Sequence, residues 1–478
     1  MNEQSKTITF IAVAAGFALI GWFARPATPT RDLLDDSGQE FFASFTDPLE
    51  AASLEIIDYD EDTSTPRAFK VARYEGVWSI PSHENYAADA ENRFAEAATS
   101  MMGLIKGSNI SDSPADHEMY GVIDPLNAQA GAIGVGKRIK LESESNATLV
   151  DLIVGKEVKD QADYRYVRQP GKSRVYLCAI KTDKLTTKFE DWIERDLLKL
   201  NANNISQVVV NDYSIDEINR RIVQGDRLTL NYNKEDRTWA LDDLADSEAL
   251  IDTKITEMKN ALSGLKIVDV YRKPEGLSAE LRADDAMELE GSDVASLSKR
   301  GYYIIGGQLL SNKGEMYVRM NDGVQYTLHF GEIALGSGSP DVSEETSDDI
   351  SGGGGGANRY LFVTVGFNKS LLPEPELEIV PDIPDALLDS LTANDDSDNS
   401  RIKIAMAAAR EKTEVSNSKK LAEYEEKLIS AQERVTELKE HFADWYYVIS
   451  DSVFEQIRLT RSDVVEIVAE ENEDDTDG

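Results

Sequence analysis

Hydrophobic and polar residues follow the same order twice along this chain. In each half an alternating stretch leads into a Trp-x-Ile or Trp-x-Leu triplet, at Trp78–Ile80 and at Trp239–Leu241. Alternation with a period of two residues predicts a β-strand, and apolar residues at helical spacing behind each triplet predict a helix. The residues at helical spacing are Phe94, Ala97, Ala98 and Met101 in the first half and Ile251, Ile255, Met258 and Leu262 in the second.

Further pairs of apolar segments extend this repeat in both directions. The pairs are ASLEIIDYD with SQVVVNDYS, LVDLIVGKE with YTLHFGEIA, DYRYVRQ with NRYLFVTVG, and SRVYLCAI with ADWYYVISD. We expect each member to be a strand. A helix is expected after the last pair, over KFEDWIERDLLKL in the first copy and over SVFEQIRLTRSDVVEI in the second. The pattern therefore predicts an α+β fold, with two repeated modules of mostly antiparallel sheet and packed helices.

The N-terminus carries the longest uncharged stretch. Residues 7–24, TITFIAVAAGFALIGWFA, contain no charged side chain. As a helix this stretch would be about 27 Å long, which is enough to cross the hydrocarbon core of a bilayer. A cleaved signal peptide is the alternative, but the sequence Ala-Arg-Pro-Ala at 24–27 is a poor cleavage site. We expect an uncleaved transmembrane signal anchor, and the flanking charges leave its orientation open.

The second copy contains large insertions. Residues 335–357 are rich in glycine and acidic residues, and residues 373–400 are rich in proline and aspartate, so both are expected to be flexible loops. Residues 401–441 predict a long inserted helix, with a break expected at Ser416-Asn417-Ser418. Apolar residues then repeat every seven positions, as in a coiled coil. They are Leu421, Leu428, Val435 and Phe442, with Tyr424, Ala431, Leu438 and Trp445 three residues on. Packing against the chain's own sheet and packing against a partner both fit this pattern.

These segments give a domain organisation for the whole chain. It consists of a short N-terminal tail (1–6), the transmembrane anchor (7–24), a linker (25–44), the first α+β module (45–200), the second α+β module (201–372 and 441–468), two flexible loops (335–357 and 373–400), the inserted helix (401–441) and an acidic tail (469–478).

Charge and composition exclude several classes of function. The 88 acidic and 50 basic residues give a net charge of −38, so the surface repels nucleic acid, and we expect no nucleic-acid partner. The only cysteine, Cys178, lies in the apolar run VYLCAI, where a buried strand position is expected. His83, His117, His329 and His441 show no metal-ligand spacing. No metal and no cofactor are therefore expected.

One motif comes close to a nucleotide-binding loop. GAIGVGKR at 131–138 has Gly131, Gly136 and Lys137 at the spacing of a phosphate loop, but Arg138 stands where a Ser or Thr is needed to bind Mg²⁺. A turn precedes the motif, and the alternating Ile139 and Leu141 follow it, whereas a phosphate loop follows a strand and opens a helix. We expect a glycine-rich turn that leads into a hairpin strand, with Lys137 and Arg138 solvated, and no bound nucleotide.

Other candidate chemistry is equally weak. The acidic runs at 58–62 and 394–399 lack the fixed ligand offsets of a calcium loop. Asp191 and Glu194 are expected on the surface of the helix KFEDWIERDLLKL rather than as an acid–base pair. No serine or cysteine nucleophile motif is present. The sequence therefore predicts no catalytic residue, and we expect a protein that is not an enzyme.

The pattern as a whole resembles a known family. The anchor, the paired tryptophan modules and the stretches YGVIDPLNAQAGAIGVGKRIKL, LVDLIVGKEV and SLSKRGYYIIGGQLLSNKGEMYVRMNDGVQYTLHFGE are similar to the bacterial domain-of-unknown-function 4340 family, and most of all to the long versions in planctomycetes. The resemblance extends over nearly all of residues 45–468, and it provides no catalytic motif.

The resemblance implies a location and a partner. It implies a single-pass protein of the bacterial inner membrane, with the repeated modules on the periplasmic side. It also implies an accessory role beside a gliding-type ABC transport system, with the permease or an auxiliary subunit as the partner. The alternative is an envelope ligand-binding protein or hydrolase, with a site between the two modules.

Overall fold

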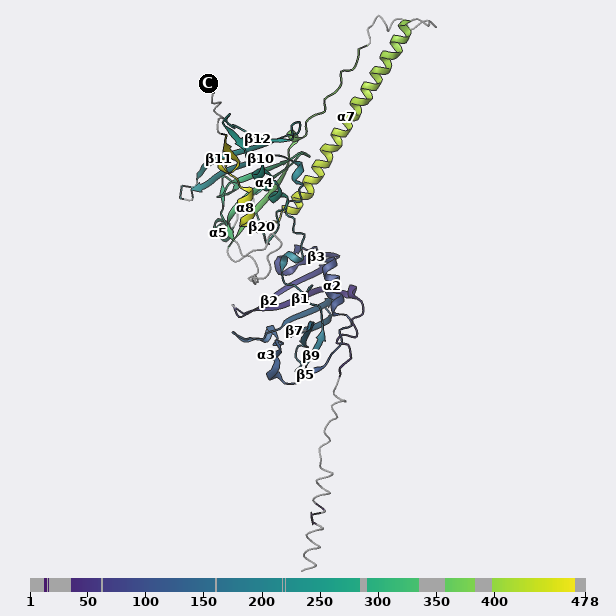
Figure 1. The fold of residues 1–478 in the computed structure, drawn as a ribbon, viewed down its shortest axis with the longest axis vertical. Helices are drawn as coiled ribbons and strands as arrows, with labels where there is room; N and C mark the ends of the chain where they lie inside the picture. Colours follow the sequence, from purple (N-terminus) through teal and green to yellow (C-terminus); the bar gives the residue numbers. More distant parts are fainter. Residues whose placement is uncertain are drawn as a thin grey trace, which may run out of the picture. The chain divides into compact units, whose positions relative to one another are not determined.

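The computed structural model describes residues 13, 14, 16, 36–61, 63–159, 161–216, 218–219, 221–283, 290–334, 357–382 and 398–468. The chain forms two compact units. Unit 1 comprises Met1–Ser82 and Ala90–Thr187, and unit 2 comprises His83–Asp89 and Lys188–Gly478. The short strand β4 (Tyr86–Ala87) lies in the segment that belongs to unit 2. Figure 1 labels the helices and strands.

Unit 1 is built on one antiparallel sheet, which confirms the strands expected in the first half. Its order is β3-β2-β1-β6-β7-β8-β9-β5. The bounds are β1 (Ala51–Asp60), β2 (Thr65–Tyr74), β3 (Val77–Ile80), β5 (Asn109–Ser111), β6 (Lys137–Ser143), β7 (Thr148–Val158), β8 (Gln161–Arg168) and β9 (Val175–Ala179). Helix α2 (Glu91–Met101) buries the four residues that the helical spacing selected. A short helix, α3 (His117–Tyr120), precedes β6.

Unit 2 is built on a second antiparallel sheet. Its order is β12-β11-β10-β17-β18-β19-β20-β14. The bounds are β10 (Ile205–Asp216), β11 (Arg221–Asn233), β12 (Thr238–Leu241), β14 (Asp269–Arg272), β17 (Glu315–Met320), β18 (Val324–Ala334), β19 (Asn358–Phe367) and β20 (Trp445–Ser450). Two small antiparallel pairs accompany it, β13 (Glu248–Leu250) with β21 (Val465–Ile467) and β15 (Tyr302–Ile305) with β16 (Gln308–Ser311). The helices are α4 (Asp252–Ser263), α5 (Gly291–Lys299), α7 (Asp398–Phe442), α8 (Asp451–Ile457) and α9 (Arg461–Val464).

The two sheets have corresponding strand orders. The order in unit 2 reproduces that of unit 1 when β10, β11, β12 and β14 are matched with β1, β2, β3 and β5, and β17 to β20 with β6 to β9. The two tryptophans occupy matching strands, β3 and β12, and each lies against the helix that follows. Trp78 packs on Phe94 of α2, with ring centroids 4.4 Å apart, and the Lys259 ammonium of α4 lies 5.5 Å from the Trp239 ring centroid.

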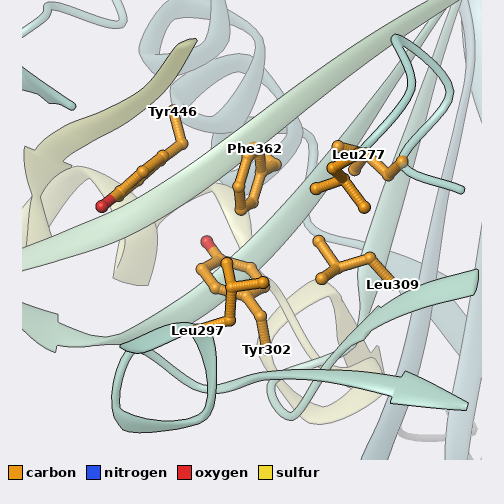
Figure 2. Packing of buried hydrophobic residues seen from close by; sticks show 7 residues of the cluster. Leu277, Leu297, Tyr302, Leu309, Phe362 and Tyr446 are labelled. Atoms are coloured by element: carbon orange, nitrogen blue, oxygen red, sulfur yellow. The ribbon is translucent and has the colours of Figure 1, made fainter. Parts of the chain in front are cut away.

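A compact apolar cluster joins the β15–β16 hairpin and α5 to the sheet of unit 2. Figure 2 shows its aromatic rings, Tyr302, Phe362 and Tyr446, with leucine side chains beside them. The rings of Tyr302 and Phe362 meet edge to face, with centroids 4.8 Å apart. Each fully buried side chain of this size contributes about 1.5–3 kcal/mol. Helix α5 and the β15–β16 hairpin are therefore packed parts of unit 2.

The sequence predicted a helix over KFEDWIERDLLKL, and this prediction is wrong. Only a single 3-10 turn forms there, at Phe189–Asp191, so Asp191 and Glu194 do not share a helix face. Trp192, Leu197 and Leu198 are almost fully buried, and Leu197 N–H donates to Leu265 O while Ile267 N–H donates to Arg195 O. Backbone pairing with the segment after α4 therefore replaces the helix, because tertiary packing overrides local propensity. The other predicted segment, SVFEQIRLTRSDVVEI, contains two short helices, α8 and α9.

Several predicted segments lie outside the described residues. Of the anchor at 7–24, only residues 13, 14 and 16 are described, and they are helical. No helix within the described part of the chain has both the length and the hydropathy to cross a membrane. The loop at 335–357 is described only at its last residue, and the acidic tail at 469–478 is not described. These predictions stay predictions.

Candidate functional site

The candidate site is an arm of unit 2 formed by α7 and the segment that runs beside it. We call residues 372–382 the strap, and α7 with the strap the arm. Helix α7 has 45 residues and is continuous through Ser416-Asn417-Ser418, so the break expected there is wrong. At 1.5 Å per residue the helix is about 67 Å long. Figure 1 shows it as one unbroken helix.

The C-terminal end of α7 is packed within unit 2. Ala431, Val435, Leu438 and Phe442 are buried, and α7 contacts β19 and β18. These are heptad positions, so for this stretch the chain's own sheet is the packing partner. Trp445 does not continue the seam, because the helix ends at Phe442 and Trp445 begins β20.

The rest of the arm exposes large aliphatic side chains. The exposed fractions are 70% for Ile404, 64% for Val415, 51% for Ile429 and 47% for Leu421 on α7, and 94% for Ile379 on the strap. Ile404, Val415 and Ile429 fall on one side of the helix, because they lie 11 and 14 residues apart, or close to three and four helical turns. A row of aliphatic groups at the surface is typical of a contact surface for another molecule.

The strap is held along α7 by side chains that bind its backbone. Asn417 accepts from Glu378 N–H through Oδ1 at 2.9 Å and donates to Glu378 O through Nδ2 at 2.8 Å. The Lys420 ammonium donates to Glu376 O at 3.2 Å and pairs with the Glu378 carboxylate at 3.0 Å. The Tyr424 hydroxyl donates to Leu372 O at 3.3 Å. Residues 373–382 form no helix or strand, as expected for a loop, and these contacts hold part of them against α7, whereas the flexibility expected for 373–400 stays a prediction.

A groove of about 870 Å³ lies at the base of the arm. One wall is α7 from Lys420 to Arg434. The other walls are the start of the strap, the turn between β17 and β18, and Lys234 from the turn between β11 and β12. Apolar groups line part of the groove, namely Leu372, Pro373, Pro375, Tyr424 and Ala431. Its volume is in the range of ligand pockets.

Three cations repeat every seven residues along the groove wall, at Lys420, Lys427 and Arg434. Lys420 pairs with Glu378 of the strap, and Arg434 pairs with Asp322 of the β17–β18 turn at 2.6 Å. Lys427 lies between them. Within the described residues, no carboxylate lies at ion-pair distance from Lys427 or from Lys234 on the opposite wall. The groove lining also includes Glu374, Glu423 and Glu426 besides Asp322, so its four cations lie among four carboxylates.

The GAIGVGKR stretch folds as expected, as a turn that leads into a hairpin. Lys137 and Arg138 begin β6, which pairs with β7. Gly134 has φ +72°, and a Cβ there would lie 2.1 Å from Glu118 O, so glycine is required. Arg138 is not solvated, which corrects the prediction. Its guanidinium donates to Asp151 at 2.8 and 2.9 Å and to Asp124 at 3.1 Å. No helix follows the glycines, so the backbone does not form a phosphate cradle of the phosphate-loop kind.

A buried polar cluster in unit 2 was not predicted. The Glu315 carboxylate accepts from the Tyr213 hydroxyl at 2.7 Å, from the Tyr317 hydroxyl at 2.8 Å and lies 3.2 Å from His329 Nδ1. Burial acts to raise the pKa of Glu315, but the hydrogen bonds and the charge of His329 outweigh it and lower the pKa to about 2. The hydrogen-bonded residues come from three strands, and Tyr213 and Glu315 are 102 positions apart, so no local motif could reveal the cluster.

Cys178 is buried in β9 as expected, and burial raises the pKa of its thiol to about 11. The part of the chain that the structure describes holds no group of three or more His, Cys, Asp or Glu side chains placed to bind a metal ion.

Comparison with known proteins gives one family. Residues 78–285 match the family model described as "Domain of unknown function (DUF4340)", so the resemblance found in the sequence is confirmed over this segment. Along the chain, the matched segment begins in β3 of unit 1 and ends after β14 of unit 2. No curated protein and no solved structure matches the chain.

Proposed function

We propose that this chain, whose residues 78–285 belong to the DUF4340 family, is a membrane-anchored interaction protein without catalytic activity. Residues 7–24 anchor it in the bacterial inner membrane, and both units lie on the periplasmic side. Its partner is the permease or an auxiliary subunit of a gliding-type ABC transport system. The arm of unit 2 is the contact element.

The exposed aliphatic side chains of the arm carry this proposal. Ile379, Ile404 and Val415 are 94%, 70% and 64% exposed and lie on one helix and the strap bound to it. Single exposed apolar residues are ordinary, but an extended row of them costs solubility unless another surface covers it. An amphipathic helix that lays its apolar face on a partner is a common mode of recognition.

We further propose that units 1 and 2 are copies of one module. The corresponding strand orders support this, as does the packing of Trp78 and Trp239 against the helix that follows each of them. In this proposal α7 and the strap are additions to the second copy, because unit 1 joins β8 directly to β9 by a short turn between Arg168 and Val175. An addition confined to one copy is where a function special to that copy would reside.

Co-purification tests the arm as the contact element. The full-length protein is expressed in its native host with an affinity tag and recovered from detergent-solubilised membranes. We expect ABC transporter subunits to co-purify with the wild type and to be lost in the double variant Ile404→Glu/Val415→Glu. The matched control is Ile218→Glu, which changes a residue that is 93% exposed elsewhere in unit 2. Recovery of the same subunits with wild type and double variant would refute the proposed role of the arm.

A topology reporter tests the anchor separately. A reporter that is active only in the periplasm is fused after Gly478. We expect activity in the membrane fraction, and none when residues 7–24 are deleted. Activity in the soluble fraction of the wild type would contradict the anchor without affecting the role of the arm.

A further inference from the structure

We propose that the β5 end of unit 1 faces the lipid bilayer, and that an ionic clamp around Asp36 holds it in that orientation. The clamp consists of Asp36, Lys106, Arg174 and Tyr176. This inference rests on the proposed function, since it takes residues 7–24 as the membrane anchor. It adds which surface of unit 1 lies against lipid.

The clamp binds the chain at residue 36, where the continuous described part of unit 1 begins. The Asp36 carboxylate accepts from the Lys106 ammonium and from the Tyr176 hydroxyl, each at 2.8 Å. It also accepts from the Arg174 guanidinium at 3.1 Å. Burial acts to raise the pKa of Asp36, but these hydrogen bonds outweigh it and lower the pKa to about 2. The carboxylate is therefore charged, and able to hold its three partners, at any physiological pH.

The residues that follow Asp36 are paired with the loop between α2 and β5. Lys106 N–H donates to Gln39 O at 2.8 Å. Phe41 N–H donates to Leu104 O at 2.9 Å, and the Phe41 side chain is only 8% exposed. The chain is therefore fixed to unit 1 from Asp36 onward, and Asp36 is the point from which the tether to the anchor starts.

The number of residues before Asp36 limits the distance between this point and the anchor. Eleven residues, 25–35, separate Asp36 from the predicted anchor at 7–24. Even a fully extended chain of this length reaches no further than about 40 Å. The strands β3 and β5 lie at opposite ends of the sheet of unit 1, as Figure 1 shows, and seven strand spacings, or about 34 Å along the sheet, separate them. A tether that starts at the β5 end therefore keeps this end, and not the β3 edge, near the bilayer.

The β5 end exposes apolar side chains that a bilayer surface can cover. Ile105 is 53% exposed, Met119 is 60% exposed and Ile133 is 62% exposed. Met119 and Ile133 line one hollow of about 360 Å³ beside α3, and a hydrogen bond ties α3 to the β8–β9 turn. Apolar groups at a bilayer surface are buried at the boundary between headgroups and acyl chains. Tyr74 and Val77 at the β2–β3 turn are 76% and 66% exposed as well, and the hollow has one acidic and one basic side chain. Neither exposure nor charge therefore selects the face, and the position of the tether does.

Energy transfer from the protein to lipid tests the orientation. The full-length protein is reconstituted into vesicles of phosphatidylethanolamine and phosphatidylglycerol that contain a lipid with an acceptor dye on its headgroup. A donor dye is attached to Lys172→Cys, in the β8–β9 turn, or to Val77→Cys, on β3. The only native cysteine, Cys178, is buried, so the unsubstituted protein is the labelling blank. We expect transfer from residue 172 to be at least about twofold stronger, because five to six strand spacings, or about 24–29 Å along the sheet, separate the two labels.

A second comparison tests the clamp. The variant Asp36→Ala/Phe41→Ala removes the carboxylate and the first buried ring, so that residues 36–44 can lengthen the tether. We expect the difference in transfer between the two labels to fall below about half of its wild-type value. The matched control is Asp112→Ala, which removes another carboxylate from Arg174 but leaves the tether in place. Circular dichroism shows whether each variant retains its sheets.

Two results would overturn the inference. Equal transfer from residues 172 and 77 in the wild type would refute the orientation, whatever the variants do. An unchanged difference in Asp36→Ala/Phe41→Ala, or an equal loss in Asp112→Ala, would refute the role of the clamp. Vesicle flotation keeps the anchor separate from both. A wild-type protein that does not float with the vesicles would refute the anchor of the proposed function, whereas a protein that floats and shows equal transfer would refute only the orientation.

Discussion

The replacement Glu315→Gln tests whether the buried cluster stabilises unit 2. At neutral pH the carboxylate accepts hydrogen bonds from Tyr213 and Tyr317 and lies beside His329. Glutamine has nearly the same shape, but it has no charge and brings a donor toward groups that already donate. Its side chain would be enclosed, since the Glu315 side chain is only 8% exposed. We expect a loss of about 2–4 kcal/mol in the free energy of unfolding of unit 2 at pH 7.

The pH dependence of the same variant gives the sharper result. The pKa of Glu315 falls from 4.5 to about 2 on folding. A carboxyl whose pKa is depressed in the folded state contributes stability above its unfolded pKa and loses it as the pH falls toward the folded pKa. Linkage with these two values gives a loss of about 2 kcal/mol between pH 7 and pH 3 for Glu315 alone. The glutamine variant cannot lose this contribution, so its stability should fall by about 2 kcal/mol less over the same interval.

Pulsed amide exchange in a urea series measures the free energy of unfolding of unit 2 separately from that of unit 1. The separation is needed because a chain with two units need not unfold in one step. Peptides from β17 and β18 give the free energy at pH 7, 5 and 3. The control is Glu455→Gln, which removes the same charge from an exposed position on α8. Parallel pH profiles for the wild type and Glu315→Gln would refute the assignment of acid sensitivity to this cluster.

Three further predictions concern unit 1 and the arm. Gly134→Ala should lower the unfolding free energy of unit 1 by about 2–4 kcal/mol, because the new Cβ would meet Glu118 O. The control Gly131→Ala, at φ +75° with open space around it, should lower it by only about 1 kcal/mol, and thermal melts compare the two variants. Phe442→Ala should cost about 3–5 kcal/mol and speed proteolysis of α7, whereas Val415→Ala should change stability by less than about 0.5 kcal/mol; limited proteolysis shows the difference. The substitution Arg138→Ser completes the phosphate-loop motif, yet we expect calorimetry to detect no ATP binding by the variant. The melting temperature of the variant should fall, because Asp124 and Asp151 lose their cation.

The sequence predicted the sheets well because strands with one buried face have a local signature. Ile139 and Leu141 of β6 are both buried, whereas the alternating Arg138 and Lys140 are half-buried, as a period of two requires. Helices α2 and α4 were predicted in the same way, from apolar residues that recur with a period of 3.6. For KFEDWIERDLLKL the apolar spacing was equally good, but Trp192 and Leu197 are buried without a helix. Nothing local could reveal that the segment after α4 supplies the backbone partners of Arg195 and Leu197.

The polar contacts were beyond prediction for a different reason. Arg138 looked like a solvated charge, because its two carboxylate partners come from a loop and from the neighbouring strand. Glu315 looked like one more acid among 88. Such contacts depend on strand register, and register is fixed by the whole sheet. The sequence alone, without the order of the strands, shows which residue types are present but not which of them pair.

The heptads of α7 show how one sequence pattern can serve two kinds of contact. Leu421, Leu428, Val435 and Phe442 occupy equivalent positions, yet Leu421 is 47% exposed, while Val435 and Phe442 are 5% and 4% exposed. The pattern does not change along the helix, but the chain's own packing reaches only its C-terminal end. Burial of the Val435 and Phe442 side chains stabilises the last turns of the helix by about 1.5–3 kcal/mol each. Toward the N-terminal end the helix contacts the strap, and Ile404 and Val415 are 70% and 64% exposed, so these two side chains contribute no comparable burial. The exposed aliphatic side chains of this end are the observation on which the proposed partner contact rests.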